Sequence, residues 1–205
     1  MRTNRPAALD RSFEVTIRDG RRVLIRPVRP ADQEPLAALR AAVNRPSCAR
    51  HLLEPPTATA PRHPTEADRD RLVAWIAVPR GDRHAGVGIV RFVRDAEDPR
   101  AAEIVIAVAN DYQSAGLGKL LGETIVLSAL EEGIATLVGY VRPDDVVARR
   151  LMQRLGASPP QRRGDGLLRV EVPVGVGPRT FRASDAVSPR PPAATRSKTA
   201  AGGRC

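Results

Sequence analysis

The chain has few aromatic residues and little cysteine, and each scarcity limits what it can be. Phe, Trp and Tyr make up 3% of its 205 residues, so a core has to be built from Leu, Val, Ile and Ala. Its two cysteines, one of them the last residue, do not make a disulfide framework. No apolar run approaches the roughly 18 residues of a membrane span, and no apolar stretch follows the N-terminal arginines as in a secretory signal. We therefore expect a cytoplasmic protein without a membrane partner.

Positive charge is in excess, at a formal +10, but half of the excess lies in residues 176–205. This segment contains six basic side chains and one acidic side chain. Its Pro-, Ala- and Ser-rich composition cannot bury enough apolar surface to fold alone, which predicts a disordered tail. The remaining charge is spread along the chain and attracts anions in general. Nucleic acid is not an expected partner, because no aromatic platform or recognition motif accompanies the charge.

The length suits one domain with loose ends. We expect a flexible N-terminus over residues 1–12, a folded domain over 13–175 and the tail over 176–205. Within the domain, the order of the expected elements predicts an α/β (α+β) fold, in which helices flank a mixed central sheet.

The N-terminal half of the domain predicts a hairpin, a helix and two strands. Apolar and polar residues alternate on either side of Asp19-Gly20, which favours a hairpin with a type I′ turn. Asp32 is expected to cap the helix that follows. Further strands are expected over 72–78, where Trp75 is a core residue, and over 86–93.

The Pro-rich segment 45–64 is open to two interpretations. It could border a substrate site, or it could simply be a loop, because its prolines interrupt regular structure. His51 and His63 lie in this segment, and they could act as bases or metal ligands. Neither has a partner at metal-ligand spacing, so solvated side chains are the plainer interpretation. Thr65 is expected to start a short helix.

The segment 103–132 has the strongest functional signal. An apolar strand over 104–109 leads through a turn containing Gly116 and Gly118 into an amphipathic helix. Backbone N–H groups at a helix start have no partner and bind anions, and glycines let a phosphate approach closely. Lys119 can add a point charge. The spacing matches neither of the commoner phosphate-binding glycine motifs, so an ordinary tight turn is the alternative.

These elements resemble the GNAT superfamily of acyl-CoA-dependent N-acetyltransferases. The likeness lies in the order of strand, Gln113-x-x-Gly116-x-Gly118 turn, long helix, a strand over 134–140 and a helix that ends near Gly156. Three further stretches are similar to bacterial Pat-type protein lysine acetyltransferases: residues 16–30, 86–95 and 102–103. The resemblance implies a GNAT-like, mostly antiparallel sheet. The residue pattern itself predicts a cap at 143–145 for the last helix, a loop over 159–166 and a last strand over 167–174.

The resemblance also implies acetyl-CoA as the cosubstrate and no metal. In that family the central strand separates from its neighbour, and its free backbone groups align the acetyl and pantetheine parts. The pyrophosphate then lies on the amides of the glycine turn, and a residue early in the last helix lies near the cofactor. The matching positions here are Ile106, Ala107, Val108, Gln113, Ser114, Ala115, Gly116, Leu117, Gly118, Lys119 and Asp145.

Glu103 is the predicted general base. It is a carboxylate at the start of an otherwise apolar strand, and it matches the glutamate proposed as the base in Pat-type enzymes. The alternative is a solvated residue at a strand end. Many family members use a tyrosine as general acid where this chain has Met152, which cannot donate a proton. Tyr112 and Tyr140 are substitutes by residue type only. Asp145 stands where many members have Asn.

The sequence therefore favours acetyl transfer from acetyl-CoA to an amine, by direct attack in a ternary complex and with a protein lysine as the preferred acceptor. Two alternatives stay open. The chain could be a GNAT-like module that binds acyl-CoA without turning it over, or an acetyltransferase for small-molecule amines.

Overall fold

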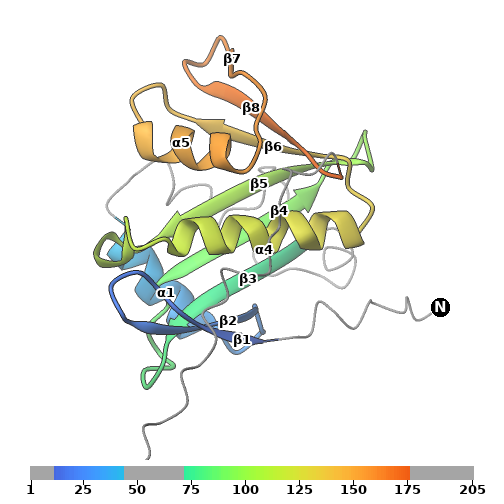
Figure 1. The fold of residues 1–205 in the computed structure, drawn as a ribbon. Coiled ribbons are helices and arrows are strands. Elements are labelled where there is room, and N and C mark those ends of the chain that lie inside the picture. Colours follow the sequence, from blue (N-terminus) through green and yellow to red (C-terminus); the bar gives the residue numbers. More distant parts are fainter. Residues whose placement is uncertain (1–11, 44–71, 176–205) are drawn as a thin grey trace, which may run out of the picture.

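The computed structural model describes residues 12–43 and 72–175 (Figure 1). Several predictions fall outside these residues: the flexible N-terminus, the Pro-rich segment with its two histidines, the helix expected at Thr65, and the tail. The described residues include strands β1 (Phe13–Thr16), β2 (Arg22–Pro27), β3 (Leu72–Pro79), β4 (Gly88–Arg94), β5 (Ala101–Val108), β6 (Thr136–Val141), β7 (Gln161–Arg162) and β8 (Leu168–Pro173). The helices are α1 (Gln33–Ala42), the single-turn 3₁₀ helix η2 (Asn110–Tyr112), α4 (Leu117–Glu131) and α5 (Val146–Arg154).

The described strands form one sheet in the order β1-β2-β3-β4-β5-β6-β8-β7. Neighbouring strands pair antiparallel except β5 and β6, which are parallel. The mixed, mostly antiparallel sheet that was predicted is thereby confirmed. The crossover from β5 to β6 contains α4, as parallel neighbours require.

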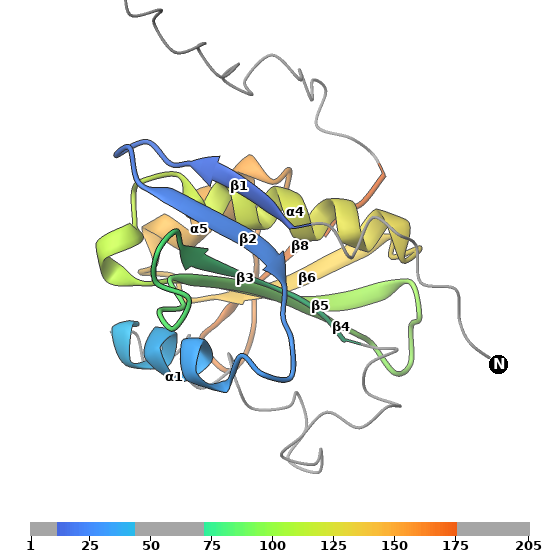
Figure 2. The same cartoon turned by 90° about the horizontal axis from the view of Figure 1, so that it is seen from below.

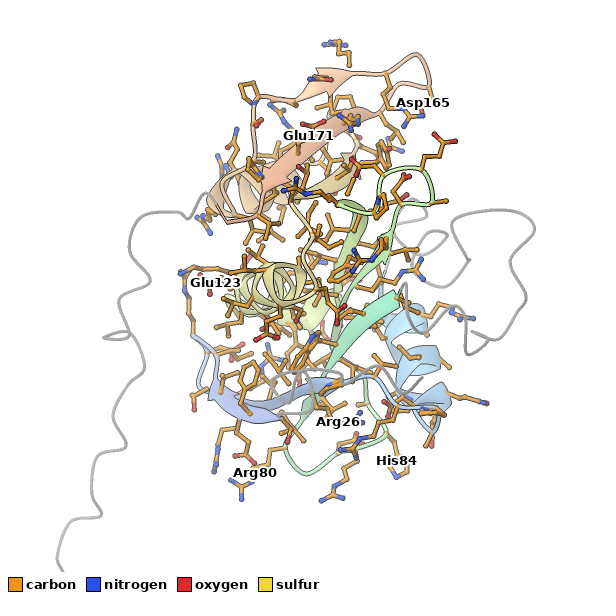
Figure 3. All side chains as sticks on the ribbon, turned by 90° about the vertical axis from the view of Figure 1, so that its right-hand side faces the viewer. Arg26, Arg80, His84, Glu123, Asp165 and Glu171 are labelled. Atoms are coloured by element: carbon orange, nitrogen blue, oxygen red, sulfur yellow. The ribbon has the colours of Figure 1, made fainter. Side chains whose placement is uncertain are left out.

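Helices cover the two faces of the sheet unequally. Helices α4 and α5 lie on one face and α1 lies on the other (Figures 2 and 3). The α4 face is closely packed, with Leu117, Leu121 and Ile125 fully buried. Trp75 belongs to this core, as predicted, and its indole N–H donates to Ser128 Oγ at 3.0 Å. Among the described helices, none has the length and apolar character needed to cross a bilayer.

The tip of the β1–β2 hairpin differs from the predicted type I′ turn. Type I′ needs positive φ at both central residues, but only Gly20 has it, at +86°. The N–H of Gly20 donates to the carbonyl of Ile17, and the N–H of Ile17 donates to the carbonyl of Arg21. The tip is therefore a three-residue loop, Arg18–Gly20, in which the left-handed glycine comes last.

Two other predictions need correction. Asp32 occupies the N-cap position of α1, but its side chain makes no capping hydrogen bond and instead binds Arg26. The stretch 159–166, predicted as a loop, contains the short strand β7 on the edge of β8. By contrast, Asp145 caps α5 as predicted, since its carboxylate accepts from the N–H of Ala148 at 2.9 Å.

Candidate active site

Strands β5 and β6 are paired at one end and separate at the other. Their register covers Ala101 to Glu103 opposite Thr136 to Val138. Both strands continue beyond this point, β5 to Val108 and β6 to Val141. They diverge toward the end of the sheet where α4 begins (Figure 1). A strand edge without a partner strand presents N–H and C=O groups that a ligand can pair with.

The peptide groups that face this separation follow from the β4–β5 ladder. At its ends, the N–H of Ala109 donates to the carbonyl of Val87 and the N–H of Asp95 donates to the carbonyl of Ala101, both at 2.9 Å. Hydrogen-bonded pairs alternate in an antiparallel ladder, so the odd-numbered residues of β5 pair with β4. Past Glu103, the peptide groups directed toward β6 belong to Ile104, Ile106 and Val108.

This alternation divides the three predicted donor-binding residues of β5. Ile106 and Val108 direct their peptide groups to the side where β6 has separated, whereas Ala107 pairs with Ile89 of β4. The carbonyl of Val108 accepts a bond from Gln113 Nε2 at 3.2 Å. Gln113 therefore links the end of β5 to the glycine turn, and Nε2 also donates to Asn110 Oδ1 at 3.1 Å.

The glycine turn has the backbone of an anion site. Gly116 is the N-cap of α4, with φ +88°, and Ser114 is also left-handed, at φ +63°. The N–H of Lys119 already donates to the carbonyl of Gly116 at 3.1 Å. By the geometry of a helix start, the N–H groups just before it, up to Gly118, remain available to a ligand. Ala115 and Leu117 are buried and anchor the turn to the core.

The charged residues predicted around this turn are engaged locally. The ammonium of Lys119 lies 3.4 Å from Glu123 Oε1, one turn along α4. Asp145 caps α5, and the neighbouring Arg142 pairs with Asp144 at 2.9 Å. A cation from outside α4 also contacts the turn, and sequence reasoning missed it. Arg18 of the β1–β2 hairpin lies against Gly116.

Glu103 lies on the α1 face of the sheet. A Cβ on Gly88 would contact Leu117 and Leu121 of α4, so Gly88 and its partner Val108 mark the α4 face. Side chains alternate along a strand, which places Glu103 on the opposite face. It is the third residue of β5 and half-buried, whereas the sequence placed it at the strand start.

Arg91 is the cation near Glu103. It lies on β4, diagonally across the ladder from Glu103 and on the same face, a spacing of roughly 7–8 Å between backbones. Burial lowers the pKa of Arg91, and the charge of Glu103 opposes that effect. A second carboxylate, Glu171 of β8, lies on the same face on the far side of Val138 and pairs with Arg169 (Figure 3).

The structure places the two candidate tyrosines at different sites. Tyr140 lies on β6, on the same face as Glu103 by register, with the guanidinium of Arg163 4.6 Å from its ring centre. Tyr112 lies in η2 beyond the other end of β5, and the guanidinium of Arg21 covers its ring at 3.6 Å. Met152 is buried, with its Cε packed beside Gly139. In the described part of the chain, no group of three or more His, Cys, Asp or Glu side chains is placed to hold a metal ion.

Comparisons with known proteins agree with this geometry. A family model described as an acetyltransferase (GNAT) domain matches residues 22–158. Acetyltransferase Pat of Mycolicibacterium smegmatis is 28% identical over 155 residues, which are 75% of this chain and 46% of that protein. The crystal structure of the GNAT domain of S. lividans PAT is similar with a TM-score of 0.65 and 25% identity, over 81% of this chain and 97% of that one.

A cAMP-binding acyltransferase from Mycobacterium smegmatis is also similar, with a TM-score of 0.54 and 29% identity. The match covers 85% of this chain and 52% of that chain. The present chain thus spans about half the length of the two mycobacterial proteins. The residues matched by the family model, 22–158, include the separated strands and the glycine turn.

Proposed function

This chain belongs to the GNAT acetyltransferase family, and on that premise we propose that it transfers the acetyl group of acetyl-CoA to the side-chain amine of a protein lysine. The lysine preference rests on the likeness to Pat-type enzymes. We further propose that residues 13–175 are the catalytic domain, which 1–12 and 176–205 flank.

One observation carries the proposal: β5 separates from β6 directly beside the glycine turn. In the proposed complex, the peptide groups of Ile106 and Val108 bind the acetyl and pantetheine parts. The free N–H groups of Ser114 to Gly118 bind the pyrophosphate. Glu103, on the α1 face and near the paired end of β5, is then positioned toward the acceptor.

Glu103 performs the proton chemistry in this scheme. A lysine amine has a pKa of about 10.4, so a base must take a proton from the ammonium before attack, directly or through a water. The nitrogen then bonds to the thioester carbonyl carbon, and a backbone N–H stabilises the oxyanion. When the C–S bond breaks, the second proton of the nitrogen is transferred to the sulfur, which leaves as the CoA thiol, and Glu103 releases its proton to solvent.

Met152 supports a second candidate. Its buried thioether leaves no hydroxyl where many family members place the general acid. A module that binds acyl-CoA without turnover would tolerate that change. Tyr140 lies on the same face as Glu103, opposite to the face on which Met152 packs beside Gly139, so a proton donated by Tyr140 would come from the acceptor side of the sheet. Binding of acetyl-CoA without product across a panel of peptides and amines would favour the module.

Replacing Glu103 by Gln tests the enzymatic role. We expect turnover to fall by roughly 10²–10⁴-fold, the usual contribution of a general base, with acetyl-CoA affinity nearly unchanged. The residual rate of the variant should rise with pH as more acceptor amine is neutral. Steady-state kinetics with a lysine peptide and calorimetry with acetyl-CoA measure both quantities.

Glu171→Gln is the matched control, since it removes a carboxylate from the same face two strands away. We expect it to keep most of the activity. Full activity in the Glu103 variant would remove Glu103 from the role of base.

A further inference from the structure

We propose that Arg18 binds a phosphate group of CoA and so holds the donor against the glycine turn from the β1–β2 hairpin. The proposal rests on the proposed function, since it concerns the same donor site. It makes the N-terminal hairpin a working part of that site.

The hairpin tip is fixed to the segment that forms the glycine turn. The N–H of Arg18 donates to the carbonyl of Ala115 at 3.0 Å. Arg21 donates through Nη2 to the carbonyl of Asp111 and stacks on the ring of Tyr112 at 3.6 Å. These contacts hold the backbone of Arg18 beside the start of α4.

The side chain of Arg18 extends across Gly116. A Cβ built on Gly116 would lie 3.6 Å from Arg18 Nε and 3.7 Å from its Cγ. Gly116 is the N-cap of α4, next to the N–H groups that are free to bind an anion. The guanidinium is therefore held near the place where a phosphate bound to those groups would lie.

Arg18 has no carboxylate counter-ion among the described residues. Its neighbours on the hairpin are paired, Arg21 with Asp19 and Arg22 with Glu14. Lys119, the lysine of the turn itself, lies beside Glu123. Within residues 12–43 and 72–175, by contrast, no carboxylate lies at ion-pair distance from Arg18, which is exposed.

A phosphate would supply the negatively charged partner of Arg18. The guanidinium is a planar fork that matches two phosphate oxygens, and it keeps its charge at any physiological pH. The backbone N–H groups of the turn and this cation would approach the phosphate from different sides. Because Arg18 is exposed, the interaction should weaken as salt is added.

The test compares Arg18→Gln with Arg22→Gln, a change of the same kind on the same hairpin. Dissociation constants are measured for acetyl-CoA, for its 3′-dephospho form and for S-acetylpantetheine, which has no nucleotide phosphates. We expect Arg18→Gln to weaken acetyl-CoA binding about tenfold, to leave acetylpantetheine binding unchanged, and to flatten the salt dependence. Arg22→Gln should stay within twofold of wild type, and Arg18→Lys should recover part of the loss.

The dephospho ligand identifies the phosphate. A loss that persists with it assigns Arg18 to the diphosphate, and a loss that disappears assigns it to the 3′-phosphate; both support the proposal. Equal acetyl-CoA affinity in wild type and Arg18→Gln would overturn it, as would an equal loss for acetylpantetheine, which would mean that Arg18 only supports the turn. If the wild type bound no acetyl-CoA, the proposed function itself would fail. Equal binding by wild type and Arg18→Gln would overturn only the role of Arg18, so the two failures are distinguishable.

Discussion

Asp32 and Arg26 form a buried pair that joins the end of β2 to the start of α1. The Asp32 carboxylate accepts from Arg26 Nη1 at 2.6 Å and Nη2 at 2.7 Å, and from the N–H of Arg29 at 2.7 Å. Burial is the largest single influence on the pKa of Asp32 and raises it, but the bonds from Arg26 and Arg29 together outweigh burial and leave that pKa below its usual value. The hydrogen bond to Asp32 raises the pKa of Arg26.

Replacing Asp32 by Asn should therefore be costly. It leaves the guanidinium of Arg26 buried without its counter-charge, which typically costs about 3–5 kcal/mol of unfolding free energy. Urea unfolding at pH 7 measures the loss. Glu14→Gln, which removes the carboxylate from exposed pairs with Arg22 and Arg80, should change stability by less than about 1 kcal/mol.

The difference in unfolding free energy between wild type and Asp32→Asn should depend on pH with a defined sign. Because the pKa of Asp32 is lower in the folded state, its contribution is complete above the unfolded value of about 3.9 and is lost as the pH falls through the folded value. Wild type and Asp32→Asn should therefore converge in stability only below about pH 4. A gap that closes already between pH 8 and 6 would contradict this assignment.

At the scale of elements, the β3–β4 connection packs against α1 at Gly86. A Cβ at this position would lie 2.2 Å from the carbonyl oxygen of Pro35 and 2.9 Å from its carbonyl carbon. Backbone atoms of a helix cannot move aside as the end of a side chain can. The close approach holds α1 against the face that carries Glu103.

Gly86→Ala should thus move α1 and destabilise the fold. We expect a loss of about 1–3 kcal/mol, typical of overpacking, measured by thermal or urea unfolding. Gly164→Ala is the control, because a Cβ there would meet nothing within 4 Å and no left-handed φ is required. Equal stabilities of the two variants would contradict the close contact between Gly86 and the backbone of α1.

Most elements could be predicted from sequence, whereas details of their ends could not. The alternation of apolar and polar residues on either side of Asp19-Gly20 predicted the hairpin correctly. The predicted turn type was wrong because Asp19 does not adopt positive φ. At Asp32 the signal for a cap was real, yet the guanidinium of Arg26 offers a charged partner that outcompetes a backbone N–H. Such partners depend on tertiary packing, which local patterns do not contain.

At the scale of the whole molecule, the donor site depends on contacts between distant segments. The Gln113-x-x-Gly116-x-Gly118 spacing predicted an anion-binding turn, and the structure places a left-handed Gly116 at the N-cap of α4, as such a turn would require. The separation of β5 from β6 could be predicted only from the family resemblance, because an apolar strand has the same sequence pattern whether or not its edge is paired. Arg18 gave no signal, since the hairpin and the turn lie far apart in sequence; Arg21 and Asp111 are 90 positions apart.

The two faces of the sheet have different roles in the account. Helices α4 and α5 cover one face (Figure 2). In the proposed complex, the nucleotide end of the donor lies at the first turn of α4. Glu103 and Tyr140 lie on the other face, where the described helix α1 covers neighbouring strands instead. Donor and acceptor would then meet where β5 and β6 separate.

The most direct test of this account is calorimetric titration of the protein with acetyl-CoA, beside two glycine variants. Gly116→Val places a β-branched residue at φ +88° in the turn and crowds Arg18, while Gly133→Val imposes a similar strain at φ +72°, in open space at the other end of α4. We expect micromolar binding by wild type and by the Gly133 variant, and at least a tenfold loss in the Gly116 variant. Absence of binding by the wild-type protein would contradict this account, because the glycine turn would then be only a turn.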